Sequence, residues 1–451
     1  MSLHIEKRKS ITKHENEVFD EIINNKNTEL KINTPQKKSI LTEKQKNRSR
    51  PIVDIVKPLG EIDINLSNGF GEDLGFKIIH ENTIYNISDL VYEKLKKVFN
   101  EILETPSYRN FCDIEFIKNQ YRLWFIKKLK DKNTIDFIDF FEDISKDKIK
   151  KFKIGIPISN TEIDYDFNIG EVLFQTIKKS DIDFWFSKYE DKKSGELEKK
   201  YKEFQGFTIA IVEIKAVKSK AISLASREIN NALSILRIFT GSNFSFKLNN
   251  SMDIYLWGAS KTKISFLFNQ NNELLSNSKG IFNIGNYQQI RQIQIDNLVK
   301  SNFYKFYNYK QKSKFQEAIQ NSIYIYSKHS VKDDLFSRIL YIFSSIESLL
   351  LNDEKEPIIA NISEKIAFIT GKSSQERKET DKLVRNVYNL RSKLVHHGKF
   401  MSFESLSIKD RLDLENFLNT VFILFNNTIH LSMKYKTRDE FMNYLKTIKY
   451  E

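Results

Sequence analysis

The sequence contains very little cysteine, proline and glycine. Its 451 residues include one Cys, 6 Pro and 14 Gly. The single thiol, Cys112, excludes an intrachain disulfide framework and a cysteine-based zinc cluster. So few Pro and Gly argue against a loop-dominated or low-complexity chain. The chain is long enough for two or three domains, each burying its own hydrophobic core.

The sequence also lacks long hydrophobic runs. The longest apolar stretches, at 339–346 and 349–351, are interrupted by Ser and Glu and are too short to cross a bilayer. Residues 1–50 are polar and charged, unlike a secretory signal. These features predict a soluble protein of a reducing cytoplasm, with no membrane partner.

Positive charge exceeds negative charge. The chain has 72 Lys and Arg against 59 Asp and Glu, a net charge of +13, which favours a polyanionic partner such as nucleic acid. Part of the excess lies in residues 1–60, predicted to form a basic, mobile leader. A solvated arm explains this cluster at least as well as a binding arm. The cluster consists of Lys37, Lys38, Lys44, Lys46, Arg48 and Arg50.

Residues 61–288 mix strand and helix patterns. The run at 207–216, FTIAIVEIKA, is apolar on both faces, as in a buried strand. Two more strands are expected at 252–257 and 263–268. The helix expected after the buried strand has an apolar stripe of Ile222, Ala225, Ile229, Leu233 and Leu236. We therefore predict a mixed α/β sensor or regulatory domain.

Residues 289–451 show helical periodicity throughout. The short connections predict antiparallel neighbours in an all-α bundle with its core at 331–433. The whole chain is therefore predicted to be an α+β multidomain protein, a mixed α/β domain followed by a helical bundle. The expected helices are 333–351, 358–370, 375–396, 408–433 and 438–449.

Two charged residues of the bundle, Glu347 and Arg391, occupy otherwise apolar helical stripes. A buried arginine is costly to desolvate unless it is paired or bound to an anion. Glu347 is the natural counter-charge, so both a structural ion pair and an anion site fit the pattern. At about 100° per residue, the stripe neighbours are Phe336, Leu340 and Phe343 for Glu347, and Val384, Tyr388 and Val395 for Arg391.

The segment around Arg391 carries a family motif. Residues 391–396 read Arg-Ser-Lys-Leu-Val-His, which fits the R-x-x-x-x-H signature of HEPN ribonucleases. The wider string NLRSKLVHHG, after a helix containing IESLLL, resembles the Apea-type branch of that superfamily. The resemblance extends from about residue 331 to the C-terminus and implies a metal-independent endoribonuclease, a hydrolase without a cofactor.

The resemblance also implies roles for individual residues. His396 would act as general acid/base on the ribose 2′-hydroxyl or the departing 5′-oxygen, because an imidazole titrates near neutral pH. Arg391 would hold the scissile phosphate and stabilise its developing charge, giving a 2′,3′-cyclic phosphate and a free 5′-hydroxyl. The residues expected to support this site are Glu347, Tyr388, Ser392 and His397.

The motif poses a geometric problem. Residues five apart on a regular helix lie about 140° apart, so Arg391 and His396 do not share a face. Either the helix is distorted near Gly398, or two copies of the motif meet across a homodimer. HEPN nucleases are known for the second arrangement, so we predict a homodimer. His397 fits a five-residue spacing, but it lies nearer the leucine stripe, so we assign catalysis to His396.

The resemblance further suggests a prokaryotic antiviral defence, abortive-infection or toxin effector. Its substrate would be RNA, with tRNA as one candidate, and its trigger would come from phage or host. A non-catalytic RNA-binding HEPN scaffold is an alternative.

Two other patterns could bind nucleic acid. Asp183, Glu213 and Lys215 resemble the D…E-x-K set of metal-dependent DNA nucleases, since Glu213 and Lys215 share one face of a strand. The segment 300–310 alternates basic and aromatic residues that could stack RNA bases, although a half-buried connector would look the same. The candidate RNA-binding residues are Lys305, Tyr307, Lys393 and Lys399.

Overall fold

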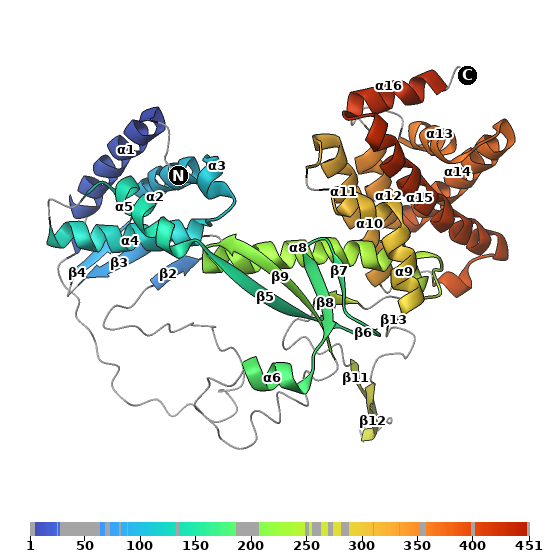
Figure 1. The fold of residues 1–451 in the computed structure, drawn as a ribbon, viewed down its shortest axis with the longest axis horizontal. Helices are drawn as coiled ribbons and strands as arrows, with labels where there is room; N and C mark the ends of the chain where they lie inside the picture. Colours follow the sequence, from blue (N-terminus) through green and yellow to red (C-terminus); the bar gives the residue numbers. More distant parts are fainter. Residues whose placement is uncertain are drawn as a thin grey trace. The chain divides into compact units, whose positions relative to one another are not determined.

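A computed structural model shows an α+β protein that divides into two units (Figure 1). Unit 1 comprises Met1–Phe152 and Ile214–Ser223, and unit 2 comprises Lys153–Glu213 and Leu224–Glu451. This division differs from the expected boundary at residue 288, since most of 153–288 falls in the same unit as the C-terminal helices. The residues that the structure describes are 5–24, 26–27, 64–67, 73–80, 83–87, 89–131, 135–185, 207–248, 252–254, 263–268, 274–280, 288–309, 311–332, 334–351, 358–397 and 402–448.

Unit 1 combines helices with a small sheet. The sheet has the order β1-β4-β3-β2, with every neighbouring pair antiparallel. Its strands are β1 (Lys26–Asn27), β2 (Ile64–Ser67), β3 (Asp73–His80) and β4 (Thr83–Asn86). Its helices are α1 (Ile5–Asn24), α2 (Asp89–Glu104), α3 (Pro106–Arg109), α4 (Ile114–Lys130) and α5 (Phe137–Lys148).

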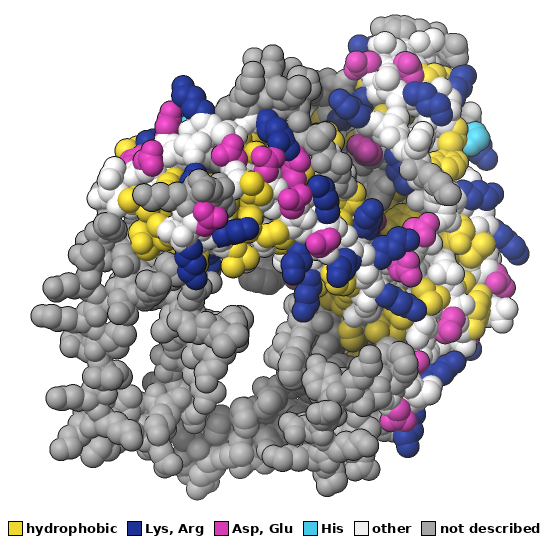
Figure 2. Space-filling model, turned by 60° about the vertical axis from the view of Figure 1, so that its left-hand side comes forward, with side chains coloured by type: hydrophobic (Ala, Val, Ile, Leu, Met, Phe, Trp, Pro, Cys, Tyr) yellow, Lys and Arg dark blue, Asp and Glu magenta, His cyan; other side chains and the backbone are white. Residues whose placement is uncertain are grey.

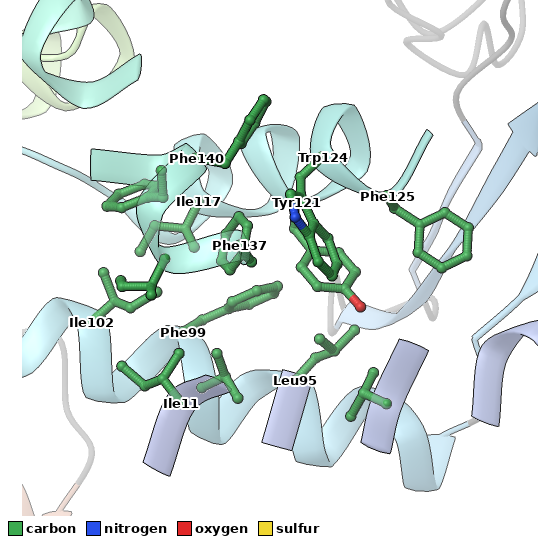
Figure 3. Packing of buried hydrophobic residues seen from close by; sticks show 14 of the residues in the cluster. Ile11, Leu95, Phe99, Ile102, Ile117, Tyr121, Trp124, Phe125, Phe137 and Phe140 are labelled. Carbon is green, nitrogen blue, oxygen red and sulfur yellow. The ribbon is translucent and has the colours of Figure 1, made fainter. Parts of the chain in front are cut away.

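The core of unit 1 is aromatic (Figure 3). Tyr121 and Trp124 of α4 lie 5.3 Å apart between ring centroids, and Phe137 meets both at 5.2 and 5.6 Å. The indole N–H of Trp124 donates to the carbonyl oxygen of Ile135 at 2.8 Å, which satisfies its one polar group. The indole donor of Trp124 is therefore satisfied while these rings bury a large apolar area.

The N-terminal residues do not all form a mobile leader, as predicted for 1–60. Residues Ile5–Asn24 form α1, in which Ile11, Val18 and Ile22 are completely buried. Spacings of seven and four residues put these side chains on one helical face, and α1 packs on α2 and α5. The leader prediction is therefore wrong for α1, and the basic cluster at 37–50 lies outside the described residues.

A five-stranded sheet, most of whose residues belong to unit 2, has the order β10-β5-β9-β8-β7. Its strands are β5 (Lys150–Ser159), β7 (Phe167–Ile169), β8 (Val172–Thr176), β9 (Thr208–Ala216) and β10 (Asp253–Ile254). The expected buried strand is confirmed as β9. Two smaller pairings are β6 (Thr161–Ile163) parallel to β13 (Gln288–Ile290), and β11 (Lys263–Phe268) antiparallel to β12 (Leu274–Gly280).

Helix α8 (Lys218–Ile238) follows β9 as expected. Ala225, Ile229 and Leu233 of its predicted stripe are fully buried, but Ile222 is 54% exposed. The buried stripe instead begins at Ala221, four residues before Ala225, so the prediction placed its first residue about 100° off the stripe.

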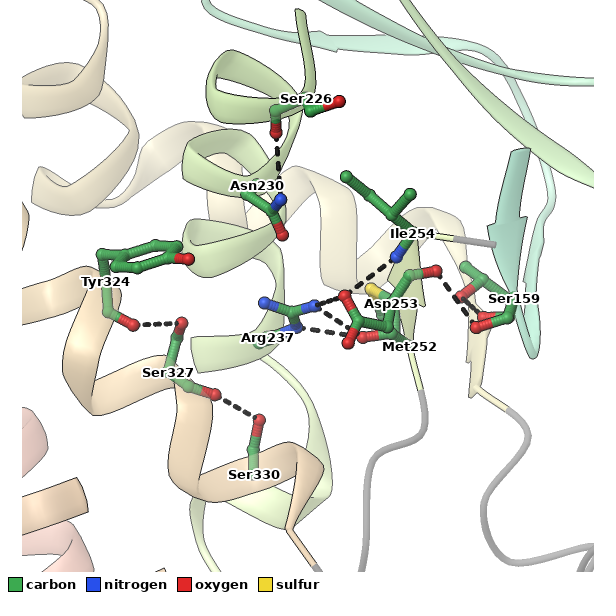
Figure 4. Close-up of polar contacts among 11 residues, drawn as sticks. Ser159, Ser226, Asn230, Arg237, Met252, Asp253, Ile254, Tyr324, Ser327 and Ser330 are labelled. Carbon is green, nitrogen blue, oxygen red and sulfur yellow. Dashed lines mark hydrogen bonds and ion pairs between the residues drawn. The ribbon is translucent and has the colours of Figure 1, made fainter. Parts of the chain in front are cut away.

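A buried ion pair fixes the end of α8 to β10 (Figure 4). The side chain of Arg237 is 0% exposed, and its guanidinium donates to Asp253 Oδ1 at 3.0 Å. It also donates to the Met252 carbonyl oxygen at 2.8 and 3.0 Å. Burial lowers the pKa of Arg237, whereas Asp253 opposes that change. The pair keeps a fully buried cation charged and hydrogen-bonded.

The rest of unit 2 is helical. The five helices predicted beyond residue 332 are confirmed to within two residues at each end. Among the described residues, none of the helices has both the length and the apolar character to cross a bilayer. The elements are α9 (Gln292–Lys300), α10 (Asn302–Tyr307), α11 (Lys314–Ser327), η3 (Lys328–Val331), α12 (Leu335–Leu350), α13 (Ile358–Thr370), α14 (Ser374–His397), η4 (Phe403–Ser405), α15 (Ile408–Lys434) and α16 (Arg438–Ile448).

Gly170, between β7 and β8, has a left-handed backbone with φ +60°. A Cβ atom there would lie 2.6 Å from Tyr307 Cε1. Gly170→Ala is therefore expected to lower the free energy of unfolding by about 2 kcal/mol, from backbone strain and overpacking. Chemical denaturation followed by circular dichroism would measure it. Gly241→Ala is the control, because its Cβ would meet only the end of the half-exposed Leu248 side chain; equal effects of the two changes would contradict the prediction.

Candidate anion site between helices α12 and α14

The two charges on apolar stripes meet across two helices. Glu347 lies in the last turn of α12, and Arg391 lies in the C-terminal half of α14. Arg391 Nη2 is 4.0 Å from Glu347 Oε1, and their side chains are 23% and 25% exposed. The charges are therefore paired as their stripe positions predicted, in a half-buried setting.

The pairing is loose. At 4.0 Å, the two atoms are beyond hydrogen-bonding distance. Glu347 Oε1 and Arg391 Nε are buried atoms without a hydrogen-bond partner. Buried polar atoms are nearly always hydrogen-bonded in folded proteins, so two buried atoms without a hydrogen-bond partner are unusual. Arg391 therefore has a hydrogen-bond donor that Glu347 does not use.

Tyr388 holds the guanidinium in place. Arg391 Nη1 donates to the Tyr388 hydroxyl at 3.3 Å, and the guanidinium carbon lies 5.2 Å from the ring centroid. Phe343 of α12 meets the Tyr388 ring edge-on at 5.3 Å and stacks on Phe417 of α15 at 5.2 Å. Three helices therefore orient Arg391 through aromatic contacts, and Phe417 is a supporting residue that local sequence spacing did not reveal.

Cations from other helices hold the end of α12 that carries Glu347. Arg438 of α16 donates to the carbonyl oxygens of Ser348 and Leu349 at 3.0 and 3.2 Å. Lys365 of α13 donates to the Leu350 carbonyl oxygen at 2.8 Å. Positive charge at a helix C-terminus satisfies unpaired carbonyls and complements the helix dipole. These contacts join residues far apart in sequence, so no local motif could identify them.

Glu347 is expected to make stability depend on pH. Burial raises its pKa above the ordinary 4.5, although Arg391 opposes the rise. The folded state therefore binds this proton more tightly than the unfolded state, and stability falls as pH rises from the ordinary pKa through the raised one. Glu347→Gln should leave the free energy of unfolding nearly unchanged near pH 4 and raise it near pH 7.

Urea denaturation at both pH values would measure this difference. Glu404 provides a control of opposite sign, because hydrogen bonds from its own backbone amide and from Ser402 lower its pKa. Its carboxylate therefore contributes stability above its ordinary pKa that is lost as pH falls through the lowered one. Glu404→Gln should consequently lose stability near neutral pH. A Glu347→Gln variant that is less stable than wild type near pH 7 would contradict the expected burial effect.

The remaining predicted motif residues are only partly described. Ser392 is half-buried and Lys393 is exposed on α14. His396 and His397 belong to the backbone of α14, but their side chains lie outside the described residues, as does Lys399. Helix α14 continues without a break to His397, so positions 391 and 396 lie about 140° apart around its axis.

The 300–310 segment has the character of a connector. Phe303 and Phe306 of α10 are each 1% exposed. The Tyr307 ring packs against Gly170, and its hydroxyl donates to the Glu228 carbonyl oxygen at 3.3 Å. Burial raises the pKa of Tyr307. This position argues against base stacking by Tyr307, whereas Lys305 is exposed.

The D…E-x-K residues are exposed but do not form a metal-ligand cluster within the described residues. Glu213 and Lys215 alternate with Ile214 on β9 and are both exposed, as predicted for one strand face. Asp183 is exposed on α6 (Lys179–Trp185). Within the described part of the chain, no three His, Cys, Asp or Glu side chains lie close enough to hold a metal ion.

Basic and acidic side chains are mixed on the face of the described residues that Figure 2 shows. Lys and Arg side chains lie there among Asp, Glu and hydrophobic ones, and the coloured residues of this face form no continuous basic stripe.

The chain matches no family model, and no curated protein or solved structure shows significant similarity to it. The resemblance to HEPN ribonucleases therefore depends on the motif residues 391–396 and on the helices around them. Function is inferred from the chemistry of these residues.

Proposed function

We propose that this chain is a metal-independent endoribonuclease in which Arg391 binds the scissile phosphate and His396 transfers a proton. The observation that carries the proposal is the half-buried Arg391 guanidinium, whose Nε has no hydrogen-bond partner and whose counter-charge, Glu347, is 4.0 Å away. A phosphate oxygen could accept hydrogen bonds that Glu347 does not. Charge-assisted bonds between a guanidinium and a phosphate are among the strongest in proteins.

The proposed reaction is an internal transesterification. The ribose 2′-oxygen attacks phosphorus and loses its proton to a base, the bond from phosphorus to the 5′-oxygen breaks, and the 5′-oxygen gains a proton. An imidazole can accept the first proton or supply the second. Arg391 would stabilise the charge that grows on the non-bridging oxygens. The products are a 2′,3′-cyclic phosphate and a 5′-hydroxyl.

We further propose that two copies of the chain form each site. The unbroken α14 supports this arrangement, because positions 391 and 396 diverge by about 140° on one helix. One copy would then supply Arg391 and the other would supply His396. If so, a mixture of Arg391→Ala and His396→Ala chains recovers activity, since each mixed dimer keeps one site with both residues. Sedimentation velocity would show whether the chain is dimeric.

The decisive assay incubates purified protein with RNA or DNA in excess EDTA. Wild type should cleave RNA to 2′,3′-cyclic ends, and Arg391→Ala and His396→Ala should not. Arg385→Ala is the matched control, because Arg385 is a partly exposed arginine of the same helix, paired with Asp381 at 2.8 Å. Cleavage of DNA that requires Mg²⁺ and Glu213 would favour the metal-dependent alternative. RNA binding by wild type without cleavage would favour the non-catalytic scaffold.

A further inference from the structure

The loop 241–248, which follows α8, wraps around a buried cation from α12; we name it the 241–248 arch. Arg338 is 1% exposed, and its guanidinium carbon lies 4.6 Å from the centroid of the Phe246 ring. The guanidinium donates to four carbonyl oxygens of the arch: Ser242 at 2.8 Å, Ser245 at 3.1 Å, Phe246 at 2.7 Å and Leu248 at 3.2 Å. Hydrogen bonds to backbone oxygens fix the path of the chain itself, so Arg338 sets the conformation of the arch.

The arch in turn holds the element that follows the HEPN-like motif. Phe246 stacks on Phe403 of η4, with centroids 6.0 Å apart and planes at 15°. Both rings are 5% exposed. Ser245 also donates from its hydroxyl to Glu415 of α15 at 3.2 Å. The arch therefore contacts α12, η4 and α15 together.

Element η4, which the Phe246–Phe403 contact holds, lies close in sequence to the end of α14. Helix α14 ends at His397, and η4 begins only six residues later at Phe403. His396 lies in the last turn of α14, so η4 follows it closely along the chain. Arg338 also lies on α12, the helix that carries Glu347.

We infer that Arg338 and Phe246 are positioning residues for the proposed ribonuclease reaction. Arg338 shapes the arch, and Phe246 transmits that shape through Phe403 to η4, which follows the end of α14 that carries His396. This inference rests on the proposed function. Displacing a catalytic group by about 1 Å can slow a reaction by orders of magnitude without changing substrate binding, so a loosened η4 should affect kcat and leave KM unchanged.

The test compares Phe246→Leu with Phe244→Leu. Phe244 belongs to the same arch, but its ring contacts Phe422 of α15 at 5.3 Å, so its loss should not loosen η4. Phe246→Leu should lower kcat for RNA cleavage about tenfold with KM within about twofold, and Phe246→Tyr should restore kcat.

Hydrogen–deuterium exchange gives a second readout that does not need activity. The Ser405 and Leu406 amides donate to the Ser402 and Phe403 carbonyl oxygens at 3.1 and 3.3 Å. Both should exchange faster in Phe246→Leu than in Phe244→Leu. With an active wild type, equal exchange or equal kcat in the two variants overturns the positioning role alone. A wild type that does not cleave RNA overturns the proposed function, and the positioning role with it.

Discussion

Replacing Arg391 with alanine is expected to lower kcat/KM for RNA cleavage by about a hundredfold or more. In the proposed site the Arg391 guanidinium binds the phosphate, and removing one donor that stabilises a developing oxyanion costs about two to three orders of magnitude. Arg391→Lys should recover part of the rate, because it keeps the charge but loses the two-pronged geometry. Single-turnover cleavage of a labelled RNA in EDTA would measure both variants.

Arg391→Ala should change the free energy of unfolding very little. Arg391 and Glu347 are 4.0 Å apart with no hydrogen bond between them, so this pair should contribute less than a well-formed buried ion pair. Lost activity with an unchanged unfolding midpoint would therefore separate a role in the reaction from a role in folding. Full activity in Arg391→Ala would contradict the proposed site, and loss of activity together with the fold would make Arg391 a structural residue.

Replacing Asp253 with alanine is expected to destabilise the protein by about 2 kcal/mol. Its carboxylate pairs with Arg237, which is completely buried at the end of α8. Breaking a buried ion pair leaves an uncompensated charge and usually costs about 3–5 kcal/mol. The loss in free energy of unfolding should be smaller for Asp253→Ala, because Asp253 is 35% exposed and the Met252 carbonyl oxygen still accepts a hydrogen bond from Arg237. Urea denaturation would measure the change.

The double variant Arg237→Met/Asp253→Ala is the control for this change. It replaces the unpaired Arg237 guanidinium with the apolar side chain of methionine. The double variant should therefore be more stable than Asp253→Ala alone. A double variant that is less stable than the single one would show that the hydrogen bonds of Arg237 outweigh the cost of burying its charge.

The C-terminal helices could be predicted because their apolar residues repeat at helical spacing over long stretches. The prediction failed near the start of α8. Ile222, in the second turn of this helix, was placed on the apolar stripe, yet it is 54% exposed. A stripe shows which residues can face a core, but a packing partner must also reach that part of the helix.

The candidate site divides in the same way. The helical periodicity of the two segments was enough to pair Glu347 with Arg391, because each charge interrupts an apolar stripe. The support around them depends on tertiary contacts: Phe417 reaches Tyr388 through Phe343, and Arg438 reaches the end of α12 from another helix. The spacing of residues along each helix does not indicate either contact.

Arg338 occupies the centre of a ring of peptide oxygens, a place that in many loops belongs to a calcium or sodium ion. Here the cation is tethered to α12 by its own side chain, so it cannot dissociate. Chelators and dilution should therefore leave the loop intact, and its order should follow that of the helix that carries the charge. The Arg338 side chain thus replaces a bound metal ion in this loop and is always present.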